Sequence, residues 1–101
     1  MATVTKALFR GAATTTVGTT LYTVPSATTT VVTNIAVTNT AATAGTFTIG
    51  LAGTALHTTA AIAANSTAYI DCKQVLTATN TITGGASATT INFHISGVEI
   101  N

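Results

Sequence analysis

The amino-acid sequence predicts an all-β fold, a single small β-sandwich of about seven or eight antiparallel strands. Apolar and polar side chains alternate with a period of two in several segments. Threonine and alanine together make up close to half of the chain, and β-branched threonine favours extended backbone. Turn residues recur roughly every ten positions. Ig-like and jelly-roll topologies both fit this spacing, and the sequence leaves that choice open.

The clearest alternation lies in segments 31–38, 46–51 and 91–96, each typical of a strand with one buried face. Asn34 and Thr48 fall on the polar side and should face outward. The opposite face should form the core, with Ile35, Phe47, Ile49 and Phe93 buried.

Shorter strands are predicted around these three, at residues 5–10, 21–24, 56–58, 66–72 and 79–83. Pro25, Gly53 and the small residues of 39–45 indicate turns or loops between strands. The pair Gly84–Gly85 reads as a hairpin turn, since no helix or lysine of a phosphate loop follows it. Residues 73–76 break the alternation and predict a single helical turn.

Length and composition predict one domain, 1–101, with a thin core. The chain is 47% hydrophobic but only 5% charged, against roughly 25% in an ordinary soluble domain. Sheet edges of free monomers usually carry charged or proline guards, and few are visible here. We therefore expect self-association. Lys6 and Arg10, expected on one face, lie in a possible N-terminal strand or arm, 1–12, that could contact a neighbouring subunit.

Several functional classes are disfavoured. A formal net charge of +1 offers no basic patch for nucleic acid. No run of about 18 apolar residues predicts a membrane span, and the N-terminal residues lack the apolar region of a signal peptide. One cysteine, Cys72, excludes an internal disulfide, and we expect a buried, inert thiol, although nearby Lys73 could lower its pKa.

Chemistry-bearing residues are few. His94 and Ser96 share a strand face, and with Asp71 they could form a triad, but no nucleophile-elbow pattern accompanies them. No pair among His57, His94, Asp71 and Glu99 has a recognisable metal-ligand spacing. We therefore expect no catalytic, cofactor-binding or metal site, and no enzymatic activity.

Two further patterns have structural explanations. Residues 65–67 match a glycosylation sequon but indicate only a turn without a secretion signal. Paired threonines two positions apart place two hydroxyls on one strand face, as in some ice-binding arrays, but no fixed repeat supports that function. These pairs are Thr3/Thr5, Thr28/Thr30, Thr46/Thr48 and Thr81/Thr83.

An ordered set of short motifs resembles a group of small phage and prophage minor virion proteins, either tail-associated or capsid-decorating. The likeness covers residues 21–100. Its pieces are Leu-Tyr-Thr-Val-Pro at 21–25, Thr-Val-Val-Thr-Asn-Ile at 30–35, Val-Thr-Asn-Thr at 37–40, Ile-Ala-Ala-Asn-Ser-Thr at 62–67, Gln-Val-Leu at 74–76 and His-Ile-Ser-Gly-Val-Glu at 94–99. The resemblance implies a structural role in a particle, with no catalytic residues to carry over.

The leading hypothesis is an external capsid decoration, or cement protein, made in the host cytoplasm and located in the virion. Its expected partners are copies of itself, with a trimer favoured, and the major capsid protein or tail proteins. Neither nucleic acid nor a membrane is expected as a partner. A tail or baseplate component is one alternative. A carbohydrate- or receptor-binding module is another, although it requires exposed aromatic side chains.

Overall fold

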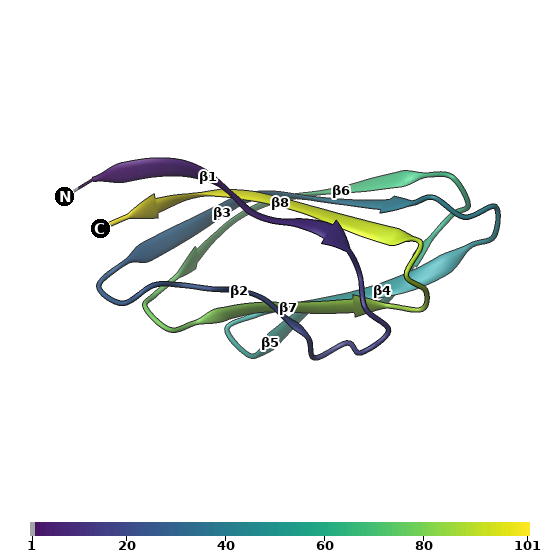
Figure 1. The fold of residues 1–101 in the computed structure, drawn as a ribbon, viewed down its shortest axis with the longest axis horizontal. Coiled ribbons are helices and arrows are strands. Elements are labelled where there is room, and N and C mark those ends of the chain that lie inside the picture. The colour runs from purple at the N-terminus through teal and green to yellow at the C-terminus, as the bar shows by residue number, and fades with distance from the viewer. Residues whose placement is uncertain (1) are drawn as a thin grey trace.

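The computed structural model describes residues 2–101 and consists of eight β-strands in two antiparallel sheets (Figure 1). The strands are β1 (Thr3–Ala12), β2 (Thr20–Thr23), β3 (Thr29–Asn39), β4 (Gly45–Leu51), β5 (Thr54–Ile62), β6 (Thr67–Leu76), β7 (Thr81–Ala86) and β8 (Ile91–Ile100). The predicted all-β sandwich is confirmed.

The strand order resolves the topology. Sheet A has the order β1-β8-β3-β6, and sheet B has the order β2-β7-β4-β5. The pairs β1–β8, β2–β7, β3–β6 and β4–β5 all run antiparallel, as in one long ribbon wound into two layers. This is a jelly-roll topology and not the Ig-like one. The two ends of the chain meet, because the backbones of Ala2 and Asn101 exchange hydrogen bonds of 2.8 and 2.9 Å.

The core lies between the sheets and contains the side chains that the alternation predicted. Ile35, Ile49 and Phe93 are completely buried, and Phe47 is nearly so. The rings of Phe47 and Phe93 pack edge to face at 6.4 Å between centroids. Asn34 and Thr48 lie on the outward side, as expected.

Three bulges lie side by side across sheet A. The pairing slips at Leu8 in β1, at Thr33 in β3 and at the Cys72–Lys73 pair in β6. Next to them, Gly97 leaves room for close backbone approach, since a Cβ there would lie 2.5 Å from the Val31 carbonyl oxygen. The aligned extra residues bend the sheet locally.

Two predictions from local alternation are wrong. Residues 73–76 form no helical turn and instead continue β6 in unchanged alternation, with polar Gln74 at an inward position opposite Val32 and apolar Val75 exposed at an outward one. Lys6 and Arg10 do not share a face, because the extra residue Leu8 stands between them. Lys6 points between the sheets toward Glu99, whereas Arg10 pairs with His94 on the outer face.

Gly84 and Gly85 also differ from expectation, because they lie inside β7 and not in a hairpin turn. A Cβ on Gly85 would lie 2.5 Å from the carbonyl oxygen of Thr16 and 2.6 Å from Cα of Val17. The β1–β2 loop therefore crosses directly over this strand. The glycines are needed here because another part of the chain packs closely against the strand. Glycine often has this role inside strands, where it does not indicate a turn.

The predicted turns elsewhere are confirmed. Ala52 and Gly53, both at positive φ, join β4 to β5 as a two-residue hairpin of the type I′ kind. Asn65 has positive φ in the β5–β6 turn, and Pro25 follows β2. The loop after Asn39 is held by that side chain, whose amide donates to the carbonyls of Thr43 and Ala63.

Candidate functional site

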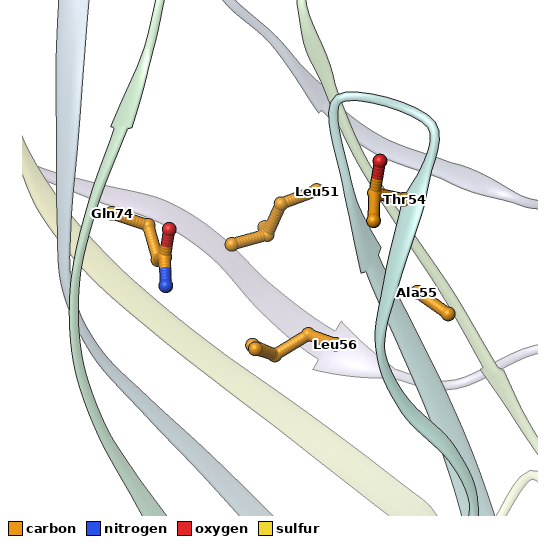
Figure 2. A pocket seen from close by; sticks show the side chains of 5 residues that line it. All are labelled: Leu51, Thr54, Ala55, Leu56 and Gln74. Atoms are coloured by element: carbon orange, nitrogen blue, oxygen red, sulfur yellow. The ribbon is translucent and has the colours of Figure 1, made fainter.

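A hollow of about 170 Å³ lies at the open side of the sandwich, where β5 and β6 are both edge strands. Figure 2 shows the side chains of Leu51 and Leu56 pointing toward Gln74, with Thr54 and Ala55 on the adjoining hairpin. No acid, base or nucleophile lines it. It is smaller than the roughly 300–1,000 Å³ typical of small-molecule sites, and we assign it no ligand.

The most connected polar group lies between the sheets near the chain ends. Glu99 of β8 accepts hydrogen bonds from the Tyr22 hydroxyl at 2.5 Å and from the Lys6 ammonium at 3.3 Å. Tyr22 comes from sheet B and also contacts the hydroxyl of completely buried Thr30 at 2.9 Å. This cluster joins both sheets through four side chains.

Electrostatics follow from that geometry. The Tyr22 hydrogen bond, which outweighs the opposing effect of burial, and Lys6 together lower the pKa of the Glu99 carboxyl below its ordinary value. Burial and the neighbouring carboxylate raise the pKa of Tyr22. At neutral pH the first shift favours the ionised Glu99 carboxylate, and the second favours the neutral Tyr22 hydroxyl that donates to it. Each member hydrogen-bonds to at least one other member, which makes the cluster a structural tie between the sheets.

The other predicted candidates are dispersed. His94 and Ser96 are exposed on the outer face of β8, as predicted, and Asp71 lies on β6 with Asn34 of β3 between it and Ser96. No hydrogen bond between any two of these three is present in the described part of the chain. His57 lies in the other sheet, where its ring packs against Phe47 at 5.8 Å. Residues 2–101 contain no group of three potential metal ligands.

Cys72 is buried, as predicted, with its sulfur 3.8 Å from the Val32 carbonyl oxygen. Burial and the negative charge of Asp71 raise the pKa of the thiol, and the opposing effect of Lys73 is smaller. We therefore expect the thiol to be protonated and slow to react at neutral pH.

Charged side chains are confined to one sheet. Lys6 and Arg10 lie on edge strand β1, Asp71 and Lys73 lie on edge strand β6, and Glu99 lies on β8. The interpretation that sheet edges lack guards is thus wrong for sheet A, because charges and bulges guard both of its edges. Sheet B has a very short edge strand, β2, and an uncharged edge strand, β5, interrupted by irregular pairing.

The outer face of sheet B is composed of small uncharged residues. Pairing and burial place two predicted threonine pairs on it, Thr46/Thr48 and Thr81/Thr83, while Thr28 and Thr30 are buried and Thr3/Thr5 belong to sheet A. Other outward-facing positions are also small, among them Thr20, Thr23, Ala55 and Ala61 and the buried glycines Gly50 and Gly85. The loop that covers Gly85 adds the half-exposed apolar side chain of Val17.

No family model and no curated protein sequence matches this chain. The likeness to phage structural proteins stays a prediction from the motifs. The described residues form no helix with the length and apolarity needed to cross a membrane.

Proposed function

We propose that this chain is an external structural protein of a phage particle, a decoration that stabilises the head by docking through the outer face of sheet B. The supporting observation is the separation of charge between the sheets. All five formally charged side chains belong to sheet A, whereas the outward surface of sheet B consists of threonine, alanine and glycine.

An uncharged face of small side chains, with the β1–β2 loop lying across it at Gly85, suits permanent contact. Removing its methyl and methylene surface from water contributes roughly 25 cal/mol per Å² before the costs of association. In Figure 1 the two sheets lie one above the other, so each sheet face extends along the long and the short axes of the molecule. These axes measure 45 and 18 Å between Cα atoms and set an upper limit on the area of one face. Such a face is comparable to the ~800 Å² that each partner contributes to a standard interface.

The partners proposed for this role are the capsid shell and further copies of the chain, with a trimer favoured. The N-terminal segment forms edge strand β1 of its own sheet, which its charges and bulge guard, so the uncharged edge strand β5 of sheet B is the edge proposed to meet a neighbouring subunit. Light scattering at micromolar concentration should give a mass above that of the monomer. A monomer across that range would remove the oligomer from the proposal and leave the docking face to be tested.

The deciding experiment adds purified protein to particles that lack it, at low and high salt, and follows genome release on heating. Binding should persist in high salt, because no charged group lies on the docking face. It should also raise the temperature of genome release, because a ligand of the assembled state stabilises that state. Thr83→Lys puts a charge at the centre of the face and should abolish binding.

The matched control is Thr5→Lys, which adds the same charge to an exposed position on sheet A and should bind normally. Binding that is lost in moderate salt, or lost equally in both variants, would contradict the docking face. Electron microscopy that locates the protein on the tail alone would favour the tail or baseplate alternative.

A further inference from the structure

The outer face of sheet A carries a different set of side chains. Cross-strand pairing lines up two rows across it. One row reads Arg10, His94, Ala36 and Tyr69. The adjacent row reads Ala7, Ser96, Asn34 and Asp71. Each row crosses all four strands, so the patch spans about 15 Å across the strands.

Tyr69 is the only aromatic side chain in the described residues that is largely exposed, at 76%. It lies on edge strand β6, and its neighbour in the row is Ala36, whose side chain is a single methyl group. Beyond Ala36 stands His94, which is also exposed. The ring of Tyr69 and the imidazole of His94 thus lie on either side of the small Ala36 side chain.

Side chains with planar hydrogen-bonding groups surround the surface between Tyr69 and His94. Asn34 and Asp71 lie one row away from Tyr69, and Arg10 lies beyond His94. Amide, carboxylate and guanidinium groups each offer two polar atoms in one plane. The outward positions of sheet B carry no group of this kind. The polar recognition chemistry of the exposed sheet surfaces is therefore gathered on sheet A around one aromatic ring.

We propose that this patch, centred on Tyr69, binds a neutral oligosaccharide. A pyranose ring has an apolar face of C–H groups, and this face packs on an aromatic ring. Around its rim it carries neighbouring hydroxyl groups, which hydrogen-bond to planar amide, carboxylate and imidazole groups. Tyr69 supplies the ring, while Asn34, Asp71 and His94 supply the rim contacts. Asp71 lies 3.5 Å from the ammonium of Lys73. This pairing balances the charge of Asp71, and the cation Arg10 lies on the opposite edge strand from Tyr69, so the surroundings of the Tyr69 ring favour a neutral ligand.

This inference does not depend on a role in a phage particle, and it is tested on the purified protein alone. Isotope-labelled protein is titrated with maltose, lactose, cellobiose and diacetylchitobiose, and amide shifts are followed by NMR. At least one disaccharide should shift the resonances of Asn34, Tyr69, Asp71 and His94 with saturation in the millimolar range. Residues on the outer face of sheet B should not shift.

Tyr69→Ala should weaken the binding about tenfold, whereas Tyr69→Phe should retain it, because stacking needs the ring and not the hydroxyl. Both variants should fold, since the side chain is exposed. Val75→Ala removes another exposed side chain of β6, away from the patch, and is the matched control that should bind normally. The proposal is overturned if none of the four sugars shifts the patch, if the shifts map to sheet B, or if Tyr69→Ala binds as well as the parent.

Discussion

The hydroxyl of Tyr22 donates a 2.5 Å hydrogen bond to Oε2 of Glu99 and thereby joins sheet B to sheet A. The two residues are 77 positions apart in the chain. Lys6 and Thr30 complete the cluster, so no buried polar side-chain atom in the described residues lacks a partner. A carboxylate between the sheets is stable here because each neighbouring group donates to it or balances its charge.

Acid should destabilise the protein through Glu99. Its folded pKa lies below the unfolded value of about 4.3. Its contribution to stability is therefore complete above that value and is lost as the pH falls through the folded pKa. Glu99→Gln should reduce the acid sensitivity measured by thermal unfolding between neutral pH and pH ~3. Asp71→Asn, at the exposed second carboxylate, is the control and should retain it. Unchanged acid sensitivity in Glu99→Gln would refute this linkage.

Phe93 should be among the most costly core residues to truncate. It is completely buried and packs edge to face on Phe47. Phe93→Ala removes these contacts and leaves a cavity, which should lower the free energy of unfolding by roughly 3–5 kcal/mol. Chemical denaturation measures the loss, with Tyr69→Ala as the exposed aromatic control. A loss below about 1 kcal/mol would show that the core does not depend on this ring.

Gly85 should not tolerate a methyl group. A Cβ at this position would overlap the backbone of Thr16 and Val17, so the β1–β2 loop would have to move. Gly85→Ala should therefore destabilise the protein by about 1–3 kcal/mol, as overpacking does elsewhere. Gly18→Ala, in the same loop but with open space around it, should change stability by less than about 0.5 kcal/mol. Equal effects in denaturant unfolding would disprove the close crossing of the loop over β7.

Cys72 should react slowly in the native protein. Its thiol is buried and its pKa is raised, so both access and the thiolate fraction are low. Ellman's reagent should modify it at a rate that follows transient opening and rises sharply in denaturant. Rapid native modification at neutral pH would show that the bulge in β6 exposes the sulfur. Lys73→Ala should not accelerate the reaction, because that cation lowers the thiol pKa.

Period-two alternation predicted where strands occur and which side chains are inside. It identified a strand in each of the eight places, and the four predicted core residues are all buried. It failed for the pair Lys6 and Arg10, since a bulge inserts one residue and reverses the alternation beyond it. It also failed at residues 73–76, since polar Gln74 lies at an inward position of β6 and apolar Val75 at an outward one. It failed at Gly85 because the reason for that glycine is a loop from elsewhere in the chain.

The sequence by itself determined the all-β class, the thin core and the scarcity of charge, because these depend on composition and on local alternation. The tertiary structure alone decided which strands are neighbours. Pairing brought Glu99 to Tyr22, confined the charges to sheet A, and set Tyr69 beside Ala36 and His94. The physical reason is that sheet register is set between distant segments by backbone hydrogen bonds and bulges, and no local pattern encodes it.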